Sequence, residues 1–266
     1  MMGGRLDRGL ATPMPNLSLA AIIASLHGHS GKTLLARVMV DYFVLSGQRP
    51  YIFDTDPVER ALYRLFPEET CLLDLALVPD QMTLFDTLVR DSPQSRIVDL
   101  THRSFGVFFD LMRQTDFIAE ARSCRVEPVI FYIPDRKRDS FEAGLALRER
   151  FPDCDFVVVE NGSLGEPRGN TRQGEAYQAL RAHNLRIAIP RLDQAIAEAL
   201  EEPSLALSDF MQRPMTNAEL RRLPGDLIRA RMQLRTWLIA MFKEIYRVTQ
   251  FIAVRTDASL ASPTYS

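Results

Sequence analysis

The stretch AAIIASLHGHSGKTLL, residues 20–35, joins an apolar run to a loop that contains glycine and histidine. The run Leu19–Leu26 predicts a buried strand, and the pattern after Gly31-Lys32-Thr33 predicts a helix that ends at Gly47. A strand, a loop and a helix in this order are the setting of a phosphate-binding loop. Backbone N–H groups and the helix dipole attract an anion there.

Two side chains of this loop have the chemistry of a nucleotide site. Lys32 can reach the β- and γ-phosphates, and the Thr33 hydroxyl can bind Mg²⁺. The general pattern has glycine at position 26, where this chain has Leu26. The alternative reading of the loop alone is an ordinary helix start with Thr33 near the N-cap.

Two further apolar strands end in aspartate. The run Pro50–Phe53 leads into Asp54-Thr55-Asp56-Pro57, and a second short run at 96–98 leads into Asp99. The carboxyl ends of parallel strands form the ligand edge of an open α/β sheet, where aspartate can order the water shell of Mg²⁺. The alternative roles are structural, because Asp56 before a proline fits a helix N-cap and Asp99 can cap the next turn.

These motifs resemble the ParA/MinD family of ATPases, which has a deviant Walker A loop. HGHSGKT at 27–33 resembles the loop K-G-G-x-G-K-T, DTDP at 54–57 resembles the motif D-x-D-P, and IVD at 97–99 resembles the Walker B strand. FVVVEN at 156–161 resembles the strand whose last Asn contacts adenine, and IAIPR at 187–191 resembles the last strand with its base-side proline loop. The similarity spans roughly residues 19–200, and the later motifs resemble a TraL/MobD-like branch encoded beside mobilisation and conjugal-transfer genes.

The resemblance implies a set of site residues. Lys32 and Asp56 are the expected catalytic residues, with Lys32 on the phosphates and Asp56 positioning the attacking water. Thr33, Asp54 and Asp99 are the expected Mg²⁺ residues, the two aspartates acting through water. The expected nucleotide contacts are His27, Gly28, His29, Ser30, Gly31, Lys32, Thr33, Leu34, Asn161 and Pro190.

Two histidines depart from the family loop. His27 replaces the lysine that reaches the partner's nucleotide across a dimer, and His29 replaces a glycine, which a bulky residue does poorly if φ is positive. Histidine is a cation only part of the time, because its reference pKa is about 6.5. We therefore expect hydrolysis that is slow and faster at mildly acidic pH. A rate that is flat between about pH 6 and 8 would exclude His27 from stabilising the transition state.

The order of elements predicts an α/β fold: a doubly wound, mostly parallel sheet with helices on both faces, as in P-loop NTPases, plus a C-terminal helical extension. We expect a flexible leader at 1–18, a nucleotide-binding domain at 19–202 and the extension with a flexible end at 203–266. Further helices are predicted at 58–66, 82–90, 104–121, 140–150, 175–183 and 193–200, and further strands at 129–133, 156–159 and 186–189.

The composition fits a globular protein without a disulfide framework. The 266 residues are 46% hydrophobic and 25% charged with a net charge of −2, which argues against nucleic-acid binding by the whole chain. Cys71, Cys124 and Cys154 form no C-x-x-C pair, which argues against a zinc site and fits a reducing cytoplasm. Arg5 and Arg8 precede the first apolar run, but that run is too short to span a membrane and leads into the loop, so we assign no signal peptide.

The C-terminal part predicts one long basic helix at 226–254. Nine basic and three acidic residues lie between Arg213 and Arg255. The helix could pair through an apolar seam in a homodimer or with a protein partner, bind DNA as the ParA resemblance implies, or lie on an anionic membrane as the MinD resemblance implies. Packing on the domain is the favoured interpretation. The seam consists of Leu234, Leu238, Met241, Ile245, Val248 and Ile252, widened by Trp237 and Phe242.

The sequence thus predicts a cytoplasmic protein that binds ATP and Mg²⁺ and acts as a slow ATP-dependent switch in plasmid or DNA transfer, partition or positioning. The alternative is an interaction module that senses ATP without hydrolysing it and presents different surfaces in its two states. A third reading, which Leu26 leaves open, is a P-loop-like fold that binds no nucleotide.

Overall fold

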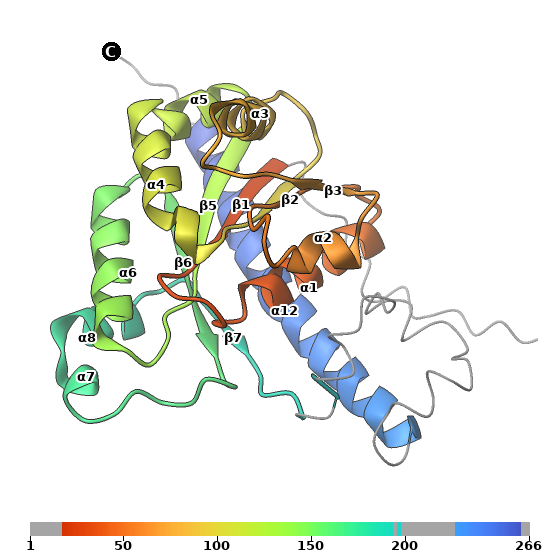
Figure 1. The fold of residues 1–266 in the computed structure, drawn as a ribbon, viewed down its shortest axis with the longest axis vertical. Coiled ribbons are helices and arrows are strands. Elements are labelled where there is room, and N and C mark those ends of the chain that lie inside the picture. The colour runs from red at the N-terminus through yellow and green to blue at the C-terminus, as the bar shows by residue number, and fades with distance from the viewer. Residues whose placement is uncertain (1–17, 194–195, 198–226, 262–266) are drawn as a thin grey trace, which may run out of the picture.

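The computed structural model describes residues 18–193, 196–197 and 227–261, so most of the expected leader and of the segment before the long helix lie outside the described residues. Seven parallel strands form one sheet in the order β3-β2-β4-β1-β5-β6-β7 (Figure 1). The strands are β1 (Ser18–Ala24), β2 (Tyr51–Asp54), β3 (Thr70–Leu72), β4 (Arg96–Asp99), β5 (Val126–Tyr132), β6 (Asp155–Asn161) and β7 (Arg186–Ile189).

Helices cover both faces of the sheet, which confirms the predicted fold class. Alternate residues of β1 enter two hydrophobic cores: Ala21 and Ile23 face α1 and α12, whereas Ala20 and Ile22 face α3 to α6 and α8. The helices are α1 (Lys32–Leu45), α2 (Ala61–Leu65), α3 (Val78–Leu88), α4 (Phe105–Gln114), α5 (Phe117–Ser123), α6 (Arg138–Arg150), α7 (Asn170–Gln173), α8 (Glu175–Arg181) and α12 (Leu227–Ala261), with a 3₁₀ turn, η1 (His102–Ser104).

Two predicted helices are interrupted or shortened by a residue with a positive φ, and the helix expected at 82–90 begins earlier, at Val78. The helix expected at 104–121 is divided into α4 and α5, because Asp116 has a φ of 48°, which a continuous right-handed helix cannot contain. The helix expected at 58–66 begins only at Ala61, because Arg60 has a φ of 51°. Of the helix expected at 193–200, residues 193, 196 and 197 lie within the described residues, and 196–197 are helical whereas Asp193 is not.

The long helix α12 packs its apolar seam against the sheet, as the favoured interpretation predicts. All six seam residues are buried in the core that α12 shares with α1, and Figure 1 shows α12 running along the sheet. The seam is therefore occupied by the protein's own core. None of the described helices is long and apolar enough to cross a membrane.

A cluster of four charged residues fixes the C-terminal part of α12 to the amino ends of β5 and β6. Glu127 and Asp155 are buried, and each pairs with an arginine. Arg122 Nη2 lies 2.6 Å from a Glu127 carboxylate oxygen, and Arg255 of α12 donates both guanidinium nitrogens to the Asp155 carboxylate. Burial raises the pKa of Asp155, and the charge of Arg255 opposes that rise. The arginine thus offsets much of the cost of a buried carboxylate.

Replacing Arg255 with Gln should lower the free energy of unfolding by about 2–3 kcal/mol at pH 7, because breaking a buried ion pair leaves a carboxylate uncompensated. The loss should be smaller at pH 4, where a protonated Asp155 needs no cation. Urea unfolding measures both values. As a control, Arg138→Gln removes an exposed pair with Glu142 on α6 and should cost less than about 0.5 kcal/mol. Equal losses in the two variants would show that Arg255 contributes no more than a surface pair.

Candidate functional site

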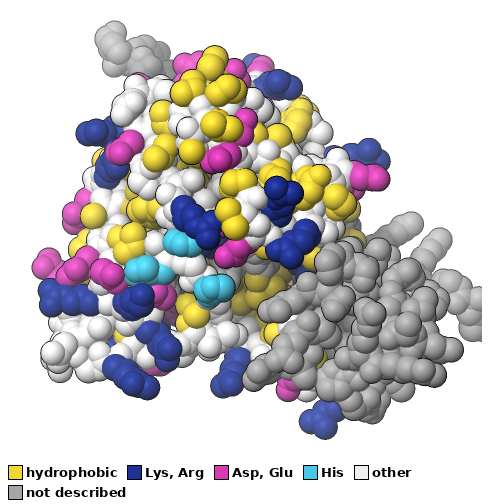
Figure 2. All heavy atoms as spheres, viewed as in Figure 1, with side chains coloured by type: hydrophobic (Ala, Val, Ile, Leu, Met, Phe, Trp, Pro, Cys, Tyr) yellow, Lys and Arg dark blue, Asp and Glu magenta, His cyan; other side chains and the backbone are white. Residues whose placement is uncertain are grey.

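A cavity of about 600 Å³ opens at the carboxyl edge of the sheet, where β1, β2, β4, β6 and β7 end. Figure 2, drawn from the same direction as Figure 1, shows histidine, basic and acidic side chains close together on this face. Three groups of lining residues are distinguished: the loop and first turn of α1 (28–34), an acidic wall and an uncharged wall, and the lining also includes Arg37, Ala61, Arg64, Leu65, Thr101 and His102. The acidic wall contains Asp54, Asp56, Glu59 and Asp99, and the uncharged wall contains Asn161, Ser163, Pro190, Leu192 and Ala197.

The ammonium of Lys32 is held inside the loop by oxygen atoms. Its Nζ donates to Ser25 Oγ at 2.8 Å and to the His27 carbonyl at 3.2 Å, and Ser30 Oγ also donates to Ser25 Oγ at 2.8 Å. Burial lowers the pKa of Lys32, while the nearby charge of Asp99 opposes that effect. Ser25 was not predicted as a site residue, although a polar residue at the end of an apolar strand is a signal that could have identified it.

Thr33 and Asp99 meet as the predicted Mg²⁺ pair would require. Thr33 Oγ1 donates to Asp99 Oδ2 at 2.6 Å, so the Asp99 side chain faces the loop instead of capping the turn that follows β4. Burial raises the pKa of Asp99 to about 7, and the neighbouring carboxylate of Asp54 adds to the rise. A cation at this point would relieve a buried charge that the protein itself compensates only in part.

Asp54 is bound to backbone N–H groups. Its Oδ2 accepts hydrogen bonds from the amides of Leu62 at 2.9 Å and Tyr63 at 3.0 Å, and its Oδ1 accepts one from the amide of Asp56 at 2.9 Å. Asp54 therefore caps the first turn of α2 from the end of β2. Burial raises the pKa of Asp54, and these three bonds oppose that rise. Its role towards Mg²⁺ stays a prediction.

Asp56 makes the hydrogen bonds of the capping interpretation and also lines the cavity, while its role in positioning a water stays a prediction. Its Oδ1 accepts from the amides of Val58 and Glu59, as a capping aspartate does, and its Oδ2 accepts from Thr101 Oγ1 at 2.8 Å. Arg103 lies 3.3 Å from the same carboxylate. Burial raises the pKa of Asp56, but these donors and the charge of Arg103 lower it further than burial raises it, so Asp56 is held as an anion facing the cavity. Thr101 and Arg103 follow β4 and were not predicted as site residues.

Gly31 and Asn161 join the loop to the end of β6. Asn161 Nδ2 donates to the Ser30 carbonyl at 2.8 Å, and its Oδ1 accepts from the amide of Ser163. Gly31 has a φ of 98°, and a Cβ there would lie 2.5 Å from Asn161 Nδ2, so any other residue would have a strained backbone and would displace the Asn161 amide. Both ends of the Asn161 amide are used within the protein. Its expected contact with adenine stays a prediction.

His29 occupies a left-handed position of the loop. Its φ is 55°, in the left-handed region, which glycine adopts most readily and in which histidine is one of the more frequent other residues. The side chain is exposed, so it meets no steric obstacle. The position does require a positive φ, as the family glycine suggested, and the chain accepts some backbone strain there.

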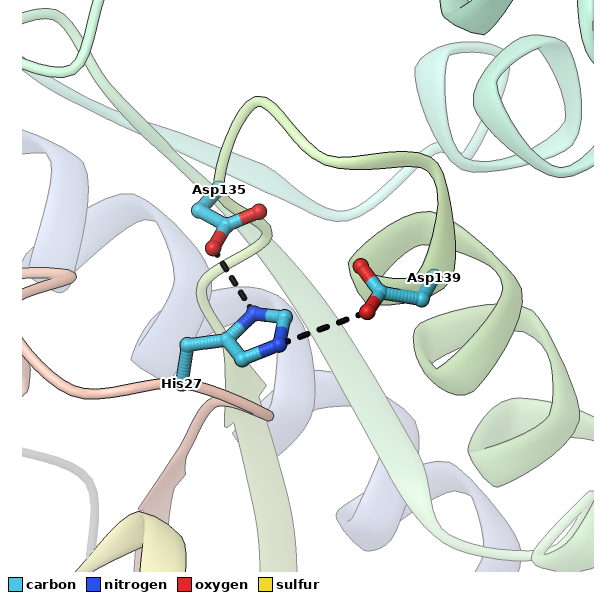
Figure 3. A group of neighbouring side chains, drawn as sticks. All are labelled: His27, Asp135 and Asp139. Carbon is cyan, nitrogen blue, oxygen red and sulfur yellow. Dashed lines mark hydrogen bonds and ion pairs between the residues drawn. The ribbon is translucent and has the colours of Figure 1, made fainter.

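His27 is directed to the loop after β5. Its Nδ1 lies 2.8 Å from Asp135 Oδ2 and its Nε2 lies 3.4 Å from Asp139 Oδ2, so both ring nitrogens face carboxylates (Figure 3). Residues 28–34 line the cavity, and His27 is not among the lining residues. The three side chains offer ligand atoms within 4.8 Å of one another, joined in this structure by the contacts of the His27 ring with the two carboxylates. The arrangement therefore ties the loop to α6.

Comparisons with known proteins add a fold likeness only. No protein-family model and no curated protein matches the sequence. The nucleotide-binding protein of Archaeoglobus fulgidus in complex with ADP has 13% identity and a TM-score of 0.41, covering 76% of this chain and 93% of that one. Cyanothece McdA in complex with ATP has 13% identity and a TM-score of 0.41, covering 85% of this chain and 97% of that one. Values this low assign neither a family nor a ligand, so function rests on the site.

Replacing Asp99 with Asn should stabilise the ligand-free protein at pH 8, by an amount on the order of 2 kcal/mol. The folded pKa of Asp99 lies above the unfolded one, so the wild type loses stability as the pH rises from about 4 to 7, whereas Asn cannot ionise. Urea unfolding in EDTA across that range should show a gain that grows with pH. The exposed control Asp86→Asn should change little at any pH. A gain for Asp99→Asn that is independent of pH would contradict the burial argument.

Proposed function

We propose that the protein binds ATP with Mg²⁺ in the cavity at the carboxyl edge of the sheet. The observation that carries the proposal is the meeting of Lys32, Thr33 and Asp99 beside the loop amides, within one cavity. A cation, an anion-binding helix start and a hydroxyl–carboxylate pair are the groups that a triphosphate and its Mg²⁺ need. The third reading, a fold that binds no nucleotide, leaves the buried ammonium and the buried carboxylate without a use.

Each wall has its own part in the proposal. The amides of Gly28, Ser30 and Gly31 and the ammonium of Lys32 would hold the phosphates, and Thr33 would bind Mg²⁺. Asp54 and Asp99 would order the water shell of the metal, and Asp56, kept anionic by Thr101 and Arg103, would position a water for hydrolysis. The remaining loop residues, His29 and Leu34, and the uncharged wall with Asn161 and Pro190 complete the nucleotide site, whereas the His27 ring is directed away from it to Asp135 and Asp139.

A second candidate function is a module that senses ATP and does not hydrolyse it. His27 favours it, because both nitrogens of its ring face Asp135 and Asp139 instead of the cavity. Hydrolysis needs positive charge at the γ-phosphate as the transition state forms, and this arrangement withholds one histidine from that task. Phosphate release at pH 6 and pH 8, measured with wild type and His27→Ala, separates the two functions.

The biological role that we propose is a ParA/MinD-like switch, with transfer, partition or positioning of plasmid DNA as its setting. Two states of the cavity would present different surfaces to a second copy of the chain, to a protein partner or to DNA. The basic residues of α12 stand outside its buried seam, with Arg229, Arg235, Lys243 and Arg255 exposed. Molecular mass with and without ATP tests the dimer, since a doubling with ATP would place the protein among dimerising switches.

Lys32→Ala should weaken binding of ATP with Mg²⁺ by about 100-fold, because it removes a charge-assisted contact to the phosphates. Isothermal titration calorimetry on the full chain measures the change. Lys243→Ala is the matched control, since Lys243 is exposed on α12 and should leave the affinity unchanged. Wild-type affinity in Lys32→Ala would refute the assignment of the loop, and no binding by either protein would refute the proposed function.

A further inference from the structure

The sole tryptophan of the chain connects α12 to the cavity. Trp237 is 5% exposed, and its Nε1 donates to the carbonyl oxygen of Pro190 at 2.6 Å. Pro190 follows β7 and belongs to the uncharged wall of the cavity. The indole N–H therefore holds a main-chain carbonyl of that wall by a hydrogen bond.

Gly162, directly after the end of β6, also contacts the main chain of this wall. The amide of Gly162 donates to the Ile189 carbonyl at 2.9 Å, and a Cβ on Gly162 would lie 3.1 Å from that oxygen and 3.2 Å from the amide nitrogen of Arg191. The main chain at 189–191 thus contacts both Gly162 and Trp237.

The charges of the cavity indicate which part of a nucleotide meets this wall. On the proposed function, the phosphates bind at the loop with Lys32. The carboxylates of the acidic wall favour a cation and disfavour an electron-rich base, so the metal and not the base belongs there. Pro190, Leu192 and Ala197 offer apolar surface without charge, which fits the faces of an aromatic base.

We propose that Trp237 is a positioning residue for the nucleotide base: its N–H holds the Pro190 wall in place, so α12 sets affinity for the base and not for the phosphates. The inference rests on the proposed function. Trp237→Phe keeps an aromatic ring in the core but leaves the Pro190 carbonyl without its donor, so the wall loses a fixed position. We expect ATP to bind about 3- to 10-fold more weakly, and inorganic tripolyphosphate to bind as it does to wild type.

The experiment is calorimetric titration of the full chain with ATP and, separately, with tripolyphosphate, both with Mg²⁺. Wild type, Trp237→Phe and Lys32→Ala are compared, with Phe251→Leu as a control at an exposed aromatic position of α12. Selective loss of ATP affinity in Trp237→Phe, loss of both ligands in Lys32→Ala and no change in the control support the inference. Equal weakening of both ligands would show a merely structural role, and unchanged ATP affinity would overturn the inference while leaving the proposed function intact. No binding of either ligand by wild type would overturn both.

A second variant keeps the test decisive if Trp237→Phe does not fold. Gly162→Ala would press a Cβ against the main chain of the same wall. It should also weaken the binding of ATP and leave the binding of tripolyphosphate unchanged. The wild type offers an independent readout, because the fluorescence of Trp237, the one tryptophan, should change with ATP and stay constant with tripolyphosphate. An emission that responds equally to the two ligands would contradict the assignment.

Discussion

The contact between Asp99 and Thr33 is the interaction on which the site depends. The parallel pairing of β1 with β4 sets Ile23 opposite Asp99, so the last residue of β4 lies beside the start of the loop. The pairing of β2 with β4 sets Asp54 opposite Asp99 in turn. Two carboxylates therefore lie side by side at a buried edge, where charges interact strongly because little water screens them. Lys32 supplies the nearest compensating charge, and its own amine is confined by Ser25 and the loop.

Much of the fold could be predicted from the sequence because its signals are local. The buried strands are short apolar runs, and the loop that lines the cavity is marked by Gly31-Lys32-Thr33 shortly after one of them. The aspartates that end β2 and β4 could be placed at the cavity because parallel strands share one carboxyl edge. The helix boundaries at Arg60 and Asp116 could not be predicted from the sequence. Both residues have a positive φ, but neither is a glycine or proline that would mark a break in a helical pattern.

The partners of individual side chains were beyond the sequence for a different reason. His27 meets Asp135, which lies 108 positions further along the chain, and the choice between that carboxylate and a phosphate depends on where β5 ends. The periodicity of α12 predicted its buried seam but not the surface that receives it. Trp237 illustrates this, since its position in the seam indicated only burial, whereas its hydrogen bond to Pro190 follows from how α12 crosses the end of β7.

Asp54 carries a thermodynamic consequence for α2. That helix has only five residues, too few to be stable alone, and the carboxylate of Asp54 binds two of its first amides. A hydrated cation that drew the same carboxylate towards itself would take the cap away from α2. Metal occupancy and the order of α2 are thereby linked with opposite sign, and linkage of this kind is reciprocal. A partner protein that bound α2 in its helical form would in turn lower the affinity of the carboxyl edge of the sheet for such a cation.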